Sequence, residues 1–199
     1  MSHFTVAVIA KDSQELEARL QPYHEYECTG IEDKYVQWIP EPFLKSLKNY
    51  WKYYIRKRDF RGFSKFMKDW NGADRRGLWF YRLTNPNAKW DWWIVGGRWT
   101  GSLIAKDGIE GIRGKPGLMT APAERNRFDS MLVKDIDFGA MGDWKPYAVI
   151  DKAGRWNGKG TMGWFGCSYD ETDDWNIAFK AWRDNLLPED RIWIVDCHI

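Results

Sequence analysis

The residues best suited to chemistry in this chain lie at positions 90–99, in the segment WDWWIVGGRW. Tryptophan rings can stack on a base, and the Arg98 guanidinium can hold a phosphate through two parallel hydrogen bonds. Glycine also lets a backbone approach a ligand closely. The segment therefore favours a phosphate-bearing, nucleotide-derived ligand. The residues assigned to this ligand are Trp90, Trp92, Gly96, Gly97, Arg98 and Trp99, with Glu25 from positions 22–30. A β-hairpin with a Gly-Gly turn and core tryptophans is the simpler interpretation.

Imidazoles offer a second kind of chemistry. The chain has three histidines, and two of them, His3 and His198, lie beside the first and last predicted strands. If those strands pair, all three histidines can converge. Two imidazoles beside a phosphodiester can act as general base and general acid while Arg98 holds the phosphate. We name His24 and His198 as the candidate catalytic residues of such a phosphodiesterase. Ordinary hydrogen-bonded histidines are the alternative.

Metal-binding residue types are present at unsuitable spacings. The set with zinc chemistry is His24, Cys28, Cys197 and His198. It has no C-x2-C pair, and adjacent residues of a regular strand point to opposite sides. Asp135 and Asp137 would share one side of a predicted strand and could bind magnesium, although two solvated acids are commoner. The sequence therefore predicts no metal and no cofactor.

Positive charge is concentrated in one stretch of the chain. The formal net charge is +2, yet residues 45–76 hold eleven Lys or Arg against three Asp. Such an asymmetry favours an anionic partner, such as a nucleic acid or an acidic protein. The basic positions proposed to bind the anion are Lys45, Lys48, Lys52 and Arg56. A solvated face of an amphipathic helix pair would explain the same pattern.

The hydrophobic periodicity predicts a single α+β domain over residues 1–199. Strands are expected at 4–10, 78–83, 131–138 and 192–195, hairpins at 90–105 and 147–156, and helices at 12–21, 42–56, 59–70 and 172–187. We expect an antiparallel or mixed sheet with helices mainly on one face and with its first and last strands adjacent. A basic helical insertion covers about 41–76, and a flexible loop rich in Gly and Pro covers about 106–128.

The cellular compartment follows from composition. Three cysteines are too few for a disulfide framework. No apolar run approaches the roughly 20 residues of a membrane helix, and the N-terminus does not resemble a signal peptide. These features predict a cytoplasmic protein with no membrane partner.

Five segments together carry a family resemblance. They are FTVAVI (4–9), PYHEYECTG (22–30), KWDWWIVGGRW (89–99), MGWFG (162–166) and VDCHI (195–199). In this order they resemble a family of uncharacterised bacteriophage proteins. The resemblance implies an accessory protein for host takeover or counter-defence, and it brings no catalytic residues with it. Combined with the residues above, the leading hypothesis is a binder of a nucleotide-derived ligand. A phosphodiesterase and a nucleic-acid or host-protein binder are the alternatives.

Overall fold

The computed structural model describes residues 2–40, 45–76, 79–118, 120, 124–163 and 167–199. It confirms the α+β class. The chain divides into two compact units, of which the first joins residues 1–24 to 89–199 and the second comprises residues 25–88. The helical insertion expected at about 41–76 therefore belongs to a larger inserted unit, which also has strands. No helix among the described residues is long and apolar enough to cross a membrane.

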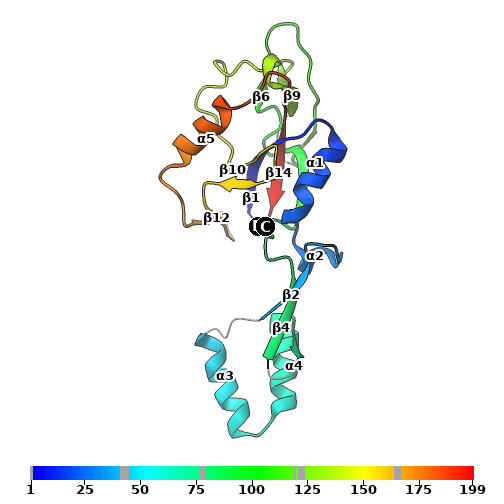
Figure 1. The fold of residues 1–199 in the computed structure, drawn as a ribbon, viewed down its shortest axis with the longest axis vertical. Coiled ribbons are helices and arrows are strands. Elements are labelled where there is room, and N and C mark those ends of the chain that lie inside the picture. The colour runs from blue at the N-terminus through cyan, green and yellow to red at the C-terminus, as the bar shows by residue number, and fades with distance from the viewer. Residues whose placement is uncertain (1, 41–44, 77–78, 119, 121–123, 164–166) are drawn as a thin grey trace. The chain divides into compact units, whose positions relative to one another are not determined.

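The first unit is built on a mixed sheet (Figure 1). Its strands are β1 (His3–Ile9), β5 (Trp92–Gly97), β7 (Lys115–Pro116), β9 (Ser130–Leu132), β10 (Ala148–Ile150), β11 (Trp156–Gly158) and β14 (Arg191–His198). The order is β11-β10-β1-β14-β5-β7, and β9 also pairs with β14. The β1–β10 and β5–β7 pairs are parallel, and the other pairs are antiparallel. The expected adjacency of the first and last strands is confirmed, because His3 lies opposite His198.

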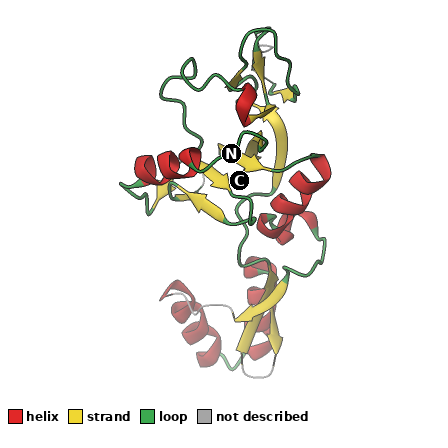
Figure 2. Cartoon of the chain, turned by 45° about the horizontal axis from the view of Figure 1, so that its top comes forward, coloured by secondary structure: helices red, strands yellow, loops and turns green. Residues whose placement is uncertain are grey.

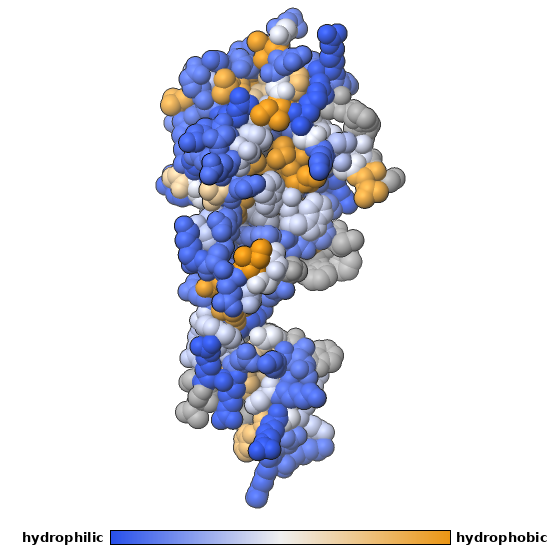
Figure 3. Space-filling model, turned by 90° about the vertical axis from the view of Figure 1, so that its right-hand side faces the viewer, coloured by the Kyte–Doolittle hydropathy of each residue, from blue (hydrophilic) through white to orange (hydrophobic). Residues whose placement is uncertain are grey.

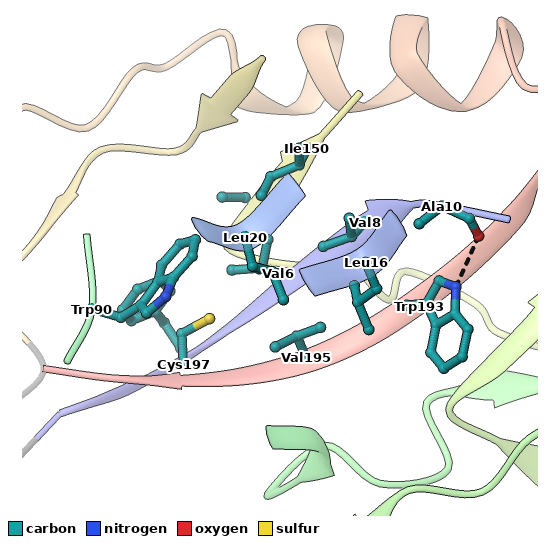
Figure 4. Packing of buried hydrophobic residues seen from close by; sticks show 12 residues of the cluster. Val6, Val8, Ala10, Leu16, Leu20, Trp90, Ile150, Trp193, Val195 and Cys197 are labelled. Carbon is teal, nitrogen blue, oxygen red and sulfur yellow. Dashed lines mark hydrogen bonds between the residues drawn. The ribbon is translucent and has the colours of Figure 1, made fainter. Parts of the chain in front are cut away.

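Helices cover both faces of this sheet (Figure 2). Helix α1 (Ser13–Leu20) contributes Leu16 and Leu20 to a core with Val6 and Val8 (Figure 4). Helix α5 (Trp175–Asp184) packs its apolar side chains against Ala7 and the opposite face. Alternate residues of a strand point to opposite faces, so β1 is apolar on both sides.

Helix α1 begins as its sequence predicts. The Asp12 carboxylate accepts a hydrogen bond from the Glu15 backbone N–H at 2.8 Å, and the Glu15 carboxylate accepts one from Lys11 N–H at 2.8 Å. These bonds satisfy backbone donors that the first helical turn leaves free. The capping residues therefore fix the point at which the chain turns from β1 into α1.

The connection that follows β5 differs from the expected hairpin. Gly96 and Gly97 end β5, with φ of +84° and +57°. Strand β6 (Leu103–Ile104) pairs with β8 (Arg127–Phe128) instead of β5.

The segment expected as a strand at 131–138 continues from β9 into a 3-10 turn, Val133–Asp135. The hairpin at 147–156 is confirmed as β10 and β11. The strands β12 (Thr161–Met162) and β13 (Ser168–Tyr169) form a separate small sheet.

The second unit is a three-stranded antiparallel sheet with helices. Its elements are α2 (Tyr26–Thr29), β2 (Gln37–Pro40), α3 (Lys45–Arg56), α4 (Phe60–Asn71), β3 (Ala73–Arg76) and β4 (Trp79–Thr84). The predicted basic helices and the strand at 78–83 are confirmed, while Pro42 lies outside the described residues. Phe63, Met67 and Ala73 form the buried core, and Figure 3 shows a mainly hydrophilic surface over this unit.

Candidate functional site

Three rings gather on one face of the first unit's sheet, where β1, β14 and β5 meet. The centroids of the His3 and His198 rings are 4.9 Å apart with an interplanar angle of 76°. The indole of Trp92 stacks on His198 at 5.0 Å and 14°, and it meets His3 edge-on at 5.3 Å. The strand register explains this arrangement, since His198 lies opposite both His3 and Trp92. We call His3 and His198 the histidine pair.

Each imidazole of the histidine pair is held by its own carboxylate. His3 Nδ1 lies 2.8 Å from Asp196 Oδ1, and His198 Nδ1 lies 2.7 Å from Asp91 Oδ1. Asp196 is only 1% exposed, and it shares the histidines' face of β14 because it precedes His198 by two residues. A carboxylate on Nδ1 orients an imidazole and leaves Nε2 for proton transfer. Neither Nε2 has a hydrogen bond to a residue in the described part of the chain.

His24 has a different environment. Its Nε2 lies 2.6 Å from the backbone oxygen of Asp91, and its backbone forms a β-bridge with Trp90. His24 and His198 thus both contact Asp91, one at the carbonyl and one at the carboxylate. The predicted catalytic residues are His24 and His198, while the imidazole that packs against His198 is that of His3.

A cavity of about 290 Å³ opens beside the end of β5. Its lining includes Arg98, Trp99, Gly101, Ser102, Arg127 and Trp144. We call it the arginine cavity. No acidic side chain is among the described residues that line it. The guanidinium of Arg98 is exposed and has no hydrogen bond or ion pair with any described residue, whereas Arg127 Nε lies 3.3 Å from a Glu124 carboxylate oxygen. The cavity therefore offers positive charge to an anion.

Two buried carboxylates shape the wall of the arginine cavity. Asp129 is fully buried and accepts hydrogen bonds from Gly101 N, Gly114 N and Thr100 Oγ1 at 2.6, 2.7 and 2.9 Å. Asp196 Oδ2 accepts one from Arg98 N–H at 2.9 Å. Asp196 therefore contacts both the backbone of Arg98 and the ring of His3.

The glycines at the end of β5 serve these carboxylates. A Cβ atom on Gly97 would collide with the Asp196 side chain, and one on Gly96 would press on Asp129. Both glycines also have positive φ, which other residues rarely adopt. They are buried, so the close approach that they permit is to two aspartates and not to a ligand. The prediction of Gly96 and Gly97 as ligand contacts is corrected accordingly.

A second cavity, of about 410 Å³, lies between the β10–β11 turn and α5. Its cations are already paired: Lys152 binds Asp190 at 2.7 Å, and Arg155 binds Asp151 at 2.8 Å. Burial raises the pKa of Asp151, but hydrogen bonds from Arg155 and Ala153 outweigh it and hold that pKa below its ordinary value. The larger cavity is therefore less suited to an anion than the arginine cavity.

The remaining predicted site residues are dispersed. Trp90 is 1% exposed and belongs to the core, which corrects its assignment as a ligand contact. Glu25 begins the second unit, immediately before α2. Lys52 and Arg56 are exposed on α3, whereas the side chains of Lys45 and Lys48 lie outside the described residues. Trp92 stacks on His198, and Arg98 and Trp99 line the arginine cavity.

Among the described residues, which leave out the Cys28 side chain, the candidate metal ligands do not gather into a site. Cys197 points into the core with Phe4 and Val195, away from His198, and burial followed by the nearby Asp196 charge raises the pKa of its thiol. Asp135 lies in a 3-10 turn, so it does not share a strand with Asp137. Within the described ranges, no three His, Cys, Asp or Glu residues could together hold a metal ion.

Sequence reasoning missed the partners that orient the site. Asp91 and Asp196 hold the histidine pair, and Asp129 holds the cavity wall. The alternation in Asp196-Cys197-His198 was the available signal, because it places an acid and an imidazole on one face of a strand.

Comparisons of the chain with models of protein families, with curated proteins and with solved structures gave no match.

Proposed function

We propose that the first unit binds a small phosphate-bearing ligand of the mononucleotide type in the arginine cavity. The proposal is carried by the guanidinium of Arg98, which pairs with no described residue and lies at a cavity that no described acidic side chain lines. A phosphate can accept two parallel hydrogen bonds from this group. Trp99 and Trp144 supply flat apolar surface for a base.

The size of the cavity narrows the ligand class. Small-molecule sites usually measure roughly 300–1,000 Å³, so a cavity of about 290 Å³ is at the small end. It suits a mononucleotide better than a dinucleotide. In the phage setting that the sequence resemblance suggests, such a binder would withhold a host signalling nucleotide.

Titration of the protein with AMP in a calorimeter tests this proposal. Charge-assisted hydrogen bonds contribute about 1.5–3 kcal/mol, so Arg98→Ala is expected to weaken AMP binding about 10- to 100-fold. Only the backbone N–H of Arg98 contacts Asp196, and alanine keeps it, so the fold should survive. Arg98→Lys should recover part of the affinity, because an ammonium keeps the charge without the fork.

The matched control is Arg155→Ala, which removes a guanidinium from the larger cavity. It should leave the affinity for AMP unchanged. The proposal fails if neither AMP nor inorganic phosphate binds, or if the Arg155 variant loses as much affinity as the Arg98 variant.

The connection between α3 and α4 favours a second candidate function, the binding of single-stranded nucleic acid. Arg56, Lys57 and Arg61 are exposed there, and Tyr53 and Phe60 are 51% and 50% exposed. Cations with aromatic faces are the usual surface for a flexible polyanion. Phosphate contacts release counterions, so binding should weaken steeply as salt rises.

Fluorescence anisotropy with a labelled single-stranded oligonucleotide measures this binding. A triple variant, Lys52→Glu, Arg56→Glu and Arg61→Glu, should bind at least 100-fold more weakly at low salt, with a shallower salt dependence. The control is a triple variant that replaces Lys106, Arg125 and Lys180 with glutamate. These three residues are exposed in the first unit. Equal losses in both variants would mean that only overall charge matters.

A further inference from the structure

We propose that the histidine pair is an acid–base site that hydrolyses a phosphodiester. This inference rests on the proposed function, because Arg98 is the group that would hold the phosphate. It extends that function from binding to turnover and assigns a role to His3. The observations that carry it are the mutual placement of the two imidazoles, the carboxylate on each Nδ1, and the link through Asp196 to Arg98.

The two imidazoles lie close together, and each is fixed by a carboxylate. Their ring centroids are 4.9 Å apart, and each Nδ1 is fixed by an aspartate at 2.8 Å or less. Both rings therefore have a set orientation, with Nε2 as the remaining nitrogen on each. One neutral imidazole can accept a proton while a protonated neighbour donates one.

A purely structural role accounts less well for the arrangement. A structural histidine in a protein interior normally satisfies its polar atoms. The side chains of His3 and His198 are only 11% and 7% exposed. Yet neither Nε2 has a hydrogen bond to a described residue, while both Nδ1 atoms have short ones. The two atoms left over are those that a substrate and a water molecule would use.

The neighbouring groups indicate the substrate class. Asp196 accepts a hydrogen bond from the Arg98 backbone N–H with one oxygen and contacts His3 Nδ1 with the other, so one carboxylate links the His3 ring to the chain at Arg98. Trp92 covers His198 with one face and remains 42% exposed. The substrate of this proposal is therefore an anionic phosphodiester with an aromatic substituent, whose phosphate Arg98 would hold and whose ring would stack on Trp92.

The reaction balances with water as the only co-reactant. The oxygen of a water molecule attacks phosphorus while the neutral imidazole of the pair takes a proton from that water. The bond from phosphorus to one ester oxygen breaks, and the protonated imidazole gives its proton to that oxygen. The products are a phosphomonoester and an alcohol, and a proton passing between the imidazoles through solvent restores the starting state.

The test measures hydrolysis of bis(p-nitrophenyl) phosphate and of the p-nitrophenyl ester of AMP, a diester that carries a single nucleotide, by the full chain. General acid–base catalysis contributes about 10²- to 10⁴-fold, so His3→Ala and His198→Ala should each lower kcat/KM by that factor. Because the two residues act as a unit, the double variant should be little worse than either single variant. Its residual rate also measures any contaminating host phosphodiesterase.

Binding of AMP separates this inference from the proposed function. Both histidine variants should keep AMP affinity within about threefold, which also shows that they fold. His24→Gln can still hydrogen-bond to a carbonyl, so it should retain turnover. Wild-type protein that binds AMP but hydrolyses neither diester overturns the acid–base site and leaves the binder intact. Turnover that survives in the His3→Ala variant also overturns the acid–base site. If the wild-type protein does not bind AMP, the proposed function itself is refuted.

Discussion

Replacing Trp90 with alanine should lower the free energy of unfolding of the first unit by about 3–5 kcal/mol, because truncating a large buried ring leaves a cavity. The indole is 1% exposed, and its centroid lies 5.8 Å from Tyr23 and 5.7 Å from Trp156. Its Nε1 is buried without a hydrogen-bond partner among the described residues, so its stabilising contribution comes from packing. Urea denaturation followed by circular dichroism measures the loss.

Trp92 provides the matched control, since it lies two residues away and is 42% exposed. Trp92→Ala should cost about 1 kcal/mol or less, because much of its ring already faces solvent. Trp90→Phe keeps a ring and should cost clearly less than Trp90→Ala. Similar losses for the two alanine variants would show that Trp90 does not fill the core as described.

Replacing Asp129 with alanine should destabilise the first unit by about 3–5 kcal/mol, because several donors would lose one shared buried acceptor. Two backbone N–H groups and the Thr100 hydroxyl would lose their acceptor inside the protein. Each buried donor left without a partner costs about 1–3 kcal/mol. The same change should weaken AMP binding, since Thr100 and Gly101 line the arginine cavity.

Asp143→Ala removes an exposed carboxylate nearby in the chain and should change stability by about 0.5 kcal/mol or less. Asp129→Asn keeps one good acceptor and should give an intermediate loss. If the alanine variant is as stable as the wild type in urea, the three hydrogen bonds cannot hold the cavity wall.

Much of the fold was predictable because its signals are local. A few neighbouring positions are enough to predict an element in three cases: the apolar run at 4–10, the capping residues Asp12 and Glu15, and the helical spacing of residues 59–70. The β5 connection was not predictable in this way. Gly96 and Gly97 read as a hairpin turn, yet their requirement comes from Asp129 and Asp196, which are distant in sequence. Glycine is typical both of a tight turn and of a backbone that another side chain approaches closely, so composition alone cannot separate the two.

The site was predictable only in part, for a related reason. The apolar patterns of β1 and β14 predict two buried strands, and their expected pairing brings His3 to His198. The choice of His3 over His24 depends on the register of that pairing. A shift of one residue would reverse the faces on which the side chains lie. Arg98 and Trp99 were identified from residue type alone, whereas Arg127 and Trp144 reach the same cavity from distant segments.

The pairing of β1 with β14 also has a consequence for the order in which the chain acquires structure. These neighbouring strands are separated by more than 180 residues, and the inserted second unit lies between them in sequence. Closing so long a loop is slow, and folding rates fall as contacts become less local. We therefore expect the second unit, whose contacts are close in sequence, to become structured first during synthesis. The two members of the histidine pair then come together only once β14 has left the ribosome.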